Sequence, residues 1–303
     1  MSRPGLDIVI VNWNAGSQLR ECLASVAAAT RPGFEITRVV VVDNASTDGS
    51  SDGLETLALP LTVIRNRENR GFGAACNQGA SGSAADDILF LNPDTRVAGD
   101  ALAVPVAFLE THPEAGICGI RLVDEHGTVH RSCARHPRPR HLAARTLGLD
   151  RIAPRAFPGL FLEEFAHDRD AKVDHVMGAF LMIRRALFEE LQGFDERFFV
   201  YLEDLDLTLR AKESGYETWF LAGASTYHRG GGTSDQVRAA RLAYSLRSRM
   251  LYGHKHYAAP VALGLDALTW CVEPVVRIAA SIVRGAFHEI PETLSGYARL
   301  AKS

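Results

Sequence analysis

The first half of the chain alternates short apolar runs with stretches of helical periodicity. Residues 7–11, 39–42 and 88–91 have the length and β-branched content of buried strands. The run 39–42 is apolar at every position, which is typical of a central parallel strand that is covered on both faces. Strands alternating with helices predict an α/β fold with a mostly parallel central sheet flanked by helices. The same patterns predict helices starting near 17 and at 51–57, 74–80, 101–112 and 184–191, and strands at 61–65, 116–123, 176–183 and 218–221.

A polar cluster follows each of the main predicted strands. Trp13 follows the first strand, Asp43 follows the second, and Asn92, Pro93 and Asp94 follow the strand at 88–91. Ligands of parallel sheets bind outside the carboxyl ends of strands, so Trp13, Asp43 and Asp94 are expected to share one crevice. Taken singly, each cluster is better explained as a turn.

The densest group of acidic side chains is Glu203, Asp204 and Asp206. The spacing of Leu205 and Leu209 predicts a helix that begins near Glu203, which puts the acids in its first turn. Free N–H groups and the helix dipole favour acids there, so capping alone accounts for them.

Composition limits the possible classes of function. The 303 residues are 47% hydrophobic and 23% charged, with a net charge of −3, which is ordinary for a globular protein and predicts no nucleic-acid partner. The five cysteines are widely spaced without a Cys-x-x-Cys pair, so we expect core positions and a reducing, cytoplasmic compartment. No run of about 18 uncharged apolar residues occurs, so a membrane-spanning helix is not expected, whereas attachment to a membrane surface stays open.

Two segments have no clear period. Residues 131–172 are rich in Arg, His and Pro and indicate either an irregular lid or a solvated surface loop. Residues 226–234 include three consecutive glycines, which suit a loop that closes over a ligand and equally suit a plain connection.

A basic helix is predicted after this loop. No acidic residue occurs between 236 and 265, while five basic ones do. Arg249 and Lys255 are candidates for binding a diphosphate, although a solvated helix face explains them better.

The next helix is predicted to be amphipathic. Asp266, Glu273, Arg277 and Arg284 fall on one stripe at 100° per residue, which leaves an apolar face that something must cover. A core or a partner subunit, as in a homodimer, is one possible cover. Peripheral contact with a bilayer, the basic helix being attracted to anionic lipid, is equally favoured.

A series of motifs runs along the first 230 residues. They are Val-Asn-Trp-Asn at 11–14, Val-Val-Asp-Asn-Ala-Ser-Thr-Asp-Gly-Ser at 41–50, Asn-Arg-Gly-Phe-Gly at 69–73, Leu-Asn-Pro-Asp at 91–94, Gly-Ala at 178–179, Phe-Asp-Glu at 194–196 through to Leu207, and Tyr-His at 227–228. In this order they resemble the large inverting glycosyltransferase family that uses nucleotide-sugar donors on a GT-A fold, often called family 2. The resemblance implies a catalytic domain at 1–234, with a nucleotide-sugar-binding half at 1–125 and an acceptor and catalytic half at 126–234, and a helical extension at 235–303. Residues 244–257 loosely resemble members that transfer rhamnose.

By this resemblance, Asp204 matches the catalytic base, with Glu203 and Asp206 beside it. Asp94 and His228 match ligands of Mg²⁺ or Mn²⁺, and such an ion neutralises a departing diphosphate. His228 alone would be interpreted as a structural histidine.

One of the implied donor residues departs from the family motif, and another has an alternative interpretation. Asn92 stands where the family often has the first Asp of Asp-x-Asp, so one carboxylate remains and the case for an obligatory metal is weaker. Asp43 resembles the acid that binds a pyrimidine N–H, and Trp13 resembles a ring placed against the base, although a buried structural Trp is as well supported. The residues implied are Val11, Trp13, Asp43, Asn69, Arg70, Gly71 and Asn92 for the donor and Gly178 and Ala179 for the acceptor.

The resemblance therefore implies an inverting glycosyltransferase that moves a sugar from a nucleotide-diphosphate donor to a saccharide or lipid-linked acceptor in cell-surface polysaccharide synthesis. The donor expected specifically is dTDP-L-rhamnose. A UDP- or GDP-hexose donor and a catalytically silent nucleotide-sugar-binding protein are the alternatives. A dinucleotide-dependent oxidoreductase would need Gly-x-Gly-x-x-Gly after the first strand, where only Gly16 is present. This expectation places the enzyme in the cytoplasm, with the inner face of the membrane as a site of peripheral attachment.

Overall fold

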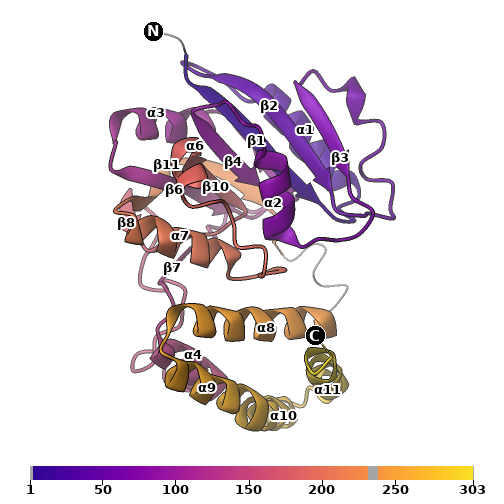
Figure 1. The fold of residues 1–303 in the computed structure, drawn as a ribbon, viewed down its shortest axis with the longest axis vertical. Coiled ribbons are helices and arrows are strands. Elements are labelled where there is room, and N and C mark those ends of the chain that lie inside the picture. Colours follow the sequence, from indigo (N-terminus) through magenta and orange to yellow (C-terminus); the bar gives the residue numbers. More distant parts are fainter. Residues whose placement is uncertain (1–2, 231–237, 303) are drawn as a thin grey trace. The chain divides into compact units, whose positions relative to one another are not determined.

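The computed structural model describes residues 3–230 and 238–302, in two compact units (Figure 1). Residues 231–234 of the glycine-rich loop predicted at 226–234 lie outside the described residues. Unit 1 comprises Met1–Arg135, Phe161–Glu196 and Asp204–Thr233, and unit 2 comprises His136–Leu160, Arg197–Glu203 and Ser234–Ser303.

Unit 1 is built on one mixed sheet, which has nine strands among the described residues. Its order is β3-β2-β1-β4-β10-β6-β11-β5, and β8 pairs with β11. The first four strands are parallel, β10 runs against both of its neighbours, and β6 and β11 are parallel again. The predicted α/β class with a mostly parallel sheet is confirmed. The strands are β1 Gly5–Asn12, β2 Glu35–Asp43, β3 Leu61–Arg65, β4 Asp87–Leu91, β5 Thr95–Val97, β6 Ala115–Val123, β8 Ala171–Val173, β10 Phe180–Arg184 and β11 Glu217–His228, and a separate pair joins β7 Cys133–Ala134 to β9 His175–Val176.

Helices cover both faces of this sheet. On β1, Ile8 and Ile10 join a core cluster with the buried residues of α1 and α3, while Val9 and Val11 join a second cluster with those of α2 and α7. The alternation follows from the two-residue period of a strand. A Cβ on Gly79 would lie 2.5 Å from a methyl group of Val9, so the small residues of α2 allow the close approach to the sheet. The helices are α1 Ser17–Ala28, α2 Phe72–Ala80, α3 Ala103–Thr111, α6 Arg185–Glu190 and α7 Glu203–Glu213.

Three predicted elements of the first 190 residues were wrong. The helix expected at 51–57 is only a 3₁₀ turn, Leu54–Thr56, which follows Gly53 at φ 64°. The strand expected at 176–183 is two strands, because the chain leaves the ladder at Gly178 and Ala179. The segment 131–172 contains α4, Pro139–Thr146, which starts at a proline in the first helical turn.

Unit 2 is helical, as predicted for the tail. Besides α4 and the short α5 Leu149–Ile152, it contains α8 Arg238–His256, α9 Ala259–Ala267, a π-helical segment Leu268–Val272, α10 Glu273–Val283 and α11 Glu289–Leu300 (Figure 1). Leu246, Tyr297 and Leu300 form the small core between α8 and α11.

One helical run among the described residues, Ala259–Val283, has the length and composition of a membrane-spanning helix, with 25 residues and an 18-residue window of mean hydropathy 1.3. The search for uncharged runs missed it because Asp266, Glu273 and Arg277 interrupt the apolar positions. By length and composition alone this run is therefore a candidate span, and the expectation that the chain has no spanning helix stays a prediction.

Four of the cysteines fill the core as predicted. Cys22, Cys76, Cys118 and Cys133 are buried, and none of the five cysteines, all of which lie in the described residues, forms a disulfide. The prediction was wrong for Cys271, which is exposed.

Candidate active site

One edge of the sheet collects the ends of strands from both halves of unit 1. The carboxyl ends of β2, β1 and β4 lie side by side, with Asn12 opposite Asp43 and Ile10 opposite Leu91. Because β10 runs antiparallel to β4, its first residue, Phe180, lies opposite Leu91 at the same edge. Trp13, Asp43 and Asp94 thus follow adjacent strands at one edge, and a shared crevice stays a prediction.

Asp43 is held rigidly at the end of β2. Its Oδ1 accepts hydrogen bonds from Asn12 Nδ2 at 3.1 Å and from the N–H of Ser46 at 3.3 Å, and its Oδ2 accepts one from the Ser51 hydroxyl at 2.8 Å. Asn12 also donates to Ser50 Oγ, and its own Oδ1 is buried without a hydrogen-bond partner in the described residues. The three hydrogen bonds to Asp43 fix the orientation of its carboxylate.

Asn44 organises the loop that carries the other predicted donor residues, a role that the sequence did not indicate. Its Nδ2 donates to Asn69 Oδ1 at 2.8 Å and to the carbonyl of Gly71 at 3.1 Å, and its Oδ1 accepts from the N–H of Arg70 at 3.1 Å. The Arg70 side chain is 43% exposed and lies 3.6 Å from Glu196. Its guanidinium is therefore free to move toward a ligand at little cost.

Val11 and Trp13 differ in burial. Val11 is buried within the sheet core, whereas Trp13 is only partly buried and belongs to none of the core clusters. The packing of Trp13 against a nucleotide base and a purely structural role both stay predictions.

Asp94 and His228 are brought together by strand pairing. The antiparallel ladder between β5 and β11 puts His228 opposite Thr95, and the N–H of Arg229 donates to the carbonyl of Asp94. As a result, His228 Nε2 lies 3.4 Å from Asp94 Oδ1, with both side chains largely buried. Asn92 lies nearby in the chain and joins this segment to Ala179 through a backbone hydrogen bond of 3.0 Å.

These two side chains fit a divalent cation that completes its shell with substrate. An oxygen and an imidazole nitrogen are present, and His228 Nδ1 is buried without a hydrogen-bond partner in the described residues. No group of three or more His, Cys, Asp or Glu able to hold a metal occurs in the described chain. Mg²⁺ and Mn²⁺ sites of this kind commonly rely on phosphate oxygens for the remaining ligands.

His130 is a further imidazole beside this pair that the sequence analysis missed. It follows β6, its ring centroid lies 6.0 Å from that of His228, and its Nε2 is buried with no hydrogen-bond partner in the described residues. Its only sequence signal was its place after the predicted strand at 116–123.

Asp204 is fixed at the second position of α7. Its Oδ2 accepts a hydrogen bond from the N–H of Gly178 at 3.0 Å, and its Oδ1 accepts one from the N–H of Leu205 at 2.8 Å. A Cβ on Gly178 would lie 3.1 Å from Asp204 Oδ2, so glycine leaves the carboxylate its place. The structure therefore joins the predicted acceptor residue Gly178 directly to the predicted base, while Ala179 is buried beneath them.

The two acids that flank Asp204 are buried. Asp206 is fully buried and pairs with Arg210 at 2.8 Å, and Arg210 in turn donates to the carbonyls of Leu191 and Gly193. Asp206 thus anchors α7 to the preceding turn. Glu203 is the first residue of the helix and is 5% exposed.

His175 is the second functional residue that the sequence analysis missed. It is buried on β9, with Nε2 3.5 Å from Asp204 Oδ2 and Nδ1 3.3 Å from Thr208 Oγ1. Burial lowers the pKa of His175, while the negative charges of Asp204 and Asp174 oppose the shift. No motif pointed to it, because the contact depends on how β9 meets α7.

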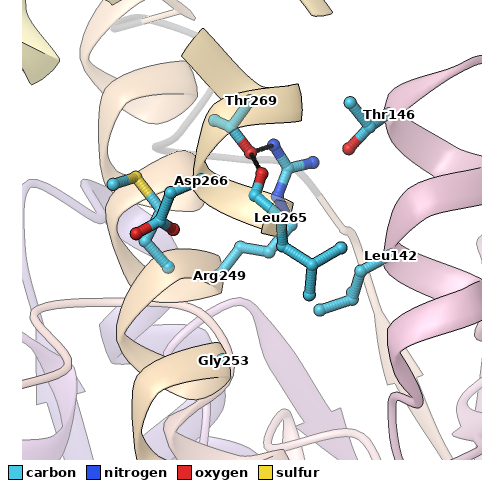
Figure 2. A pocket seen from close by; sticks show the side chains of 8 residues that line it. Leu142, Thr146, Arg249, Gly253, Leu265, Asp266 and Thr269 are labelled. Atoms are coloured by element: carbon cyan, nitrogen blue, oxygen red, sulfur yellow. Dashed lines mark hydrogen bonds between the residues drawn. The ribbon is translucent and has the colours of Figure 1, made fainter. Parts of the chain in front are cut away.

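The solvated face predicted for the basic helix of unit 2 was wrong at Arg249. This side chain is 9% exposed, forms an ion pair with Glu273 and donates to Thr269 Oγ1 at 3.0 Å. Figure 2 shows the guanidinium directed at Thr269 across a small pocket whose other wall is formed by Leu142 and Thr146 of α4. Arg249 is committed to these contacts within unit 2.

Comparisons with known proteins identify the family of the chain. A family model described as Glycosyl transferase family 2 matches residues 7–192. An N-acetylglucosaminyl-diphospho-decaprenol L-rhamnosyltransferase of Mycobacterium tuberculosis is 26% identical over 260 residues, which are 82% of this chain and 83% of the relative. Rhamnosyltransferase WbbL of Escherichia coli is 29% identical over 150 residues, 48% of this chain and 53% of the relative.

Solved structures show the fold. The mannosyltransferase PcManGT from Pyrobaculum calidifontis, in complex with GDP-Man and Mn²⁺, superposes with a TM-score of 0.58 at 18% identity and covers 99% of this chain and 88% of its own. S. aureus TarS 1-349 in complex with UDP-GlcNAc superposes with a TM-score of 0.56 at 17% identity, and the match covers 96% of this chain and 79% of its own. The predicted GT-A fold is confirmed. Because the family model covers more than half of the chain, the protein belongs to glycosyl transferase family 2 and is similar to the rhamnosyltransferases of that family.

Proposed function

We propose that this glycosyltransferase moves a hexosyl group, with inversion, from a nucleotide-diphosphate sugar to a hydroxyl of a saccharide or lipid-linked acceptor. The observation that carries the proposal is the carboxylate of Asp204, which Gly178 and Leu205 hold at the sheet edge where the predicted donor residues gather. The rhamnosyltransferase relatives support dTDP-L-rhamnose as the donor and cell-surface polysaccharide synthesis as the setting.

Asp204 acts as the general base. Its carboxylate takes the proton of the acceptor hydroxyl while the hydroxyl oxygen forms a bond to the anomeric carbon. The bond from that carbon to the diphosphate oxygen breaks on the opposite face, and its electron pair leaves with the nucleoside diphosphate. The two N–H groups on the carboxylate fix its direction, which keeps the attacking oxygen in line with the leaving group.

The donor is bound by the ends of β1, β2 and β4 and by the loop that Asn44 holds. Asp43 accepts the N–H of a pyrimidine base, Trp13 packs on that base, and Arg70 reaches the diphosphate. The backbones of Val11, Asn69, Gly71 and Asn92 shape this site.

Asp94 and His228 hold a Mg²⁺ or Mn²⁺ ion together with the donor phosphates. When bound, the ion neutralises charge that develops on the departing diphosphate. The manganese in the complex of PcManGT and the buried, unpaired Nδ1 of His228 support this assignment. No disulfide joins any of the five cysteines in the described residues, which supports a reducing compartment, the cytoplasm, as the place where the enzyme works.

Donor identity is tested by a thermal-shift panel of dTDP-rhamnose, UDP-hexoses and GDP-hexoses, with and without Mn²⁺. A ligand that binds only the folded state raises the melting temperature. UDP- and GDP-hexoses are the alternative donors, because the solved structures contain GDP-Man and UDP-GlcNAc. A chain that responds to no nucleotide sugar would not support the proposal.

Catalysis is tested separately from binding with Asp204→Asn. The amide has nearly the same shape but cannot take a proton, so we expect turnover to fall at least a thousandfold while the donor-induced thermal shift is unchanged. Exposed Asp100 provides the matched control, and Asp100→Asn should keep full turnover. Near-normal turnover of Asp204→Asn would rule out its role as base, and a silent wild-type chain that still binds donor would favour a binding protein.

A further inference from the structure

The polar stripe of α9 and α10 faces other helices of unit 2. Asp266 pairs with His254 of α8 at 2.6 Å, and Glu273, 2% exposed, pairs with Arg249 of α8 and with Arg277. On the last turn, Ser281 donates to Glu289 of α11 at 2.9 Å. The charged side of this helical run is therefore already covered by protein.

The opposite side is apolar and uncovered. Every exposed position between 261 and 283 carries an apolar residue or glycine. The run is thus inverted relative to an ordinary surface helix, in which the apolar stripe faces the core. We call this surface the outer face. Its largest exposed side chains are Leu263 at 60%, Trp270 at 39%, Val275 at 65%, Ile282 at 50% and Val283 at 87%, and Phe287 continues it at 61%.

Charge indicates what covers the outer face. The sequence of unit 2 has fifteen Lys and Arg against seven Asp and Glu, a net charge of +8, whereas that of unit 1 has eighteen against twenty-nine, a net charge of −11. Two copies joined through unit 2 would bring two strongly positive units together. A negatively charged bilayer surface, in contrast, attracts a positive unit. Basic Arg284 stands directly at the end of the outer face, and its side chain is 54% exposed.

The contacts favour a helix that lies in the interface over one that spans. A span of Ala259–Val283 would bring Asp266, Glu273 and Arg277 into the hydrocarbon and separate the first two from their partners on α8. Lying flat, the run keeps these pairs and places only apolar side chains among acyl chains.

We propose that the outer face of α9 and α10 docks unit 2 on the surface of a bilayer that contains anionic phospholipid. The inference rests on unit 2 alone and does not depend on the proposed function. Exposed Cys271 lies on the outer face, while the other four cysteines are buried, so the native chain offers a selective labelling position.

The test uses the full chain and vesicles of phosphatidylcholine with about 30% phosphatidylglycerol, or of phosphatidylcholine alone. We expect co-sedimentation with the anionic vesicles, at least tenfold weaker binding to the neutral ones, and a blue shift of an environment-sensitive fluorophore on Cys271 when vesicles are added. An alkaline wash should release the protein.

Variants separate the outer face from general adhesion. Val275→Asp and Val283→Asp put a charge on the outer face at highly exposed positions, so folding is preserved while vesicle binding falls at least tenfold. Ala107→Asp, at an exposed position of α3, is the matched control and should bind as the wild type does. Circular dichroism and melting temperature verify that all three are folded.

Three results would overturn the proposal. They are an absence of binding to anionic vesicles, resistance of the bound protein to the alkaline wash, and a dimer in light scattering that Val275→Asp or Val283→Asp dissociates. The second would indicate a spanning helix and the third a second copy of the chain. Each is independent of donor binding and turnover.

Discussion

His175 Nε2 lies 3.5 Å from Asp204 Oδ2, and both groups are shielded from solvent. The hydroxyl of Thr208 donates to the carbonyl of Leu205, and its oxygen lies 3.3 Å from His175 Nδ1, where it can accept a proton from the ring. With burial lowering the pKa of His175, the neutral ring then presents the lone pair of Nε2 to the carboxylate. A proton taken up by Asp204 can be shared with this nitrogen.

His175→Phe tests this coupling. The ring keeps most of the packing but loses both nitrogens, so we expect kcat to fall about tenfold with little change in donor KM. The midpoint of the acid limb of the pH–kcat profile should also change, because the variant removes the imidazole that lies 3.5 Å from the base. A variant with reduced kcat but an unchanged profile would show that His175 only packs.

Gly178→Ala tests how tightly the base is placed. The added Cβ would lie 3.1 Å from Asp204 Oδ2 and displace the carboxylate by a few tenths of an ångström. We expect kcat to fall about tenfold while donor affinity is retained, since small misplacements of a base are costly. Gly223 has open space around it, so Gly223→Ala should be neutral, and equal activities of the two variants would contradict the placement argument.

Metal dependence follows from Asp94 and His228. Chelation with EDTA should abolish turnover, and added Mn²⁺ or Mg²⁺ should restore it. In calorimetric titrations, Asp94→Asn and His228→Ala should weaken metal-dependent donor binding at least tenfold. His126 is 78% exposed in a loop, so His126→Ala is the control, and full activity in EDTA would exclude a metal requirement.

Asp87 gives a stability prediction away from the site. Burial raises its pKa to about 7, with Arg184 opposing the shift, and its Oδ1 has no hydrogen-bond partner in the described residues. In the unfolded chain the Asp87 carboxyl has a pKa near its ordinary value of 3.8. The unfolded state therefore binds fewer protons between these values, and stability is lost as the pH rises from about 4 to about 7.

Asp87→Asn removes this penalty. The difference of about three between the two pKa values of Asp87 corresponds to a penalty of about 4 kcal/mol in folding free energy near pH 8. Because the amide remains a buried polar group, we expect Asp87→Asn to raise the free energy of unfolding by about 2 kcal/mol near pH 8 and not at all near pH 4. Urea unfolding at the two pH values measures it. Asp100→Asn, at an exposed position, should show no gain, and a loss for Asp87→Asn near pH 8 would contradict the assignment.

Strand positions could be predicted from the sequence because burial on both faces leaves a strong local signal, as in 39–42. The same holds for the site residues that directly follow strands, such as Asp43 and Asp94, since topology alone puts them at one edge. The helix expected at 51–57 failed because Gly53 adopts a left-handed conformation that no periodicity reveals.

The contacts that complete the site could not be predicted from the sequence. His175 meets Asp204 and His130 meets His228 only after distant strands and helices have packed. The amphipathic pattern of 259–283 was identified correctly, but which side faces protein depends on ion-pair partners in α8, and a hydrophobic period alone carries no such information.

The pairing of β6 with β11 has a practical consequence for dividing the gene. The segment matched by the family, 7–192, ends before β11, and a fragment cut there would leave β6 as an open edge of nine residues, most of them buried in the native protein. Such an edge pairs readily with other chains, so the fragment should aggregate. Expression boundaries for the catalytic unit have to extend past His228, where the last ladder closes.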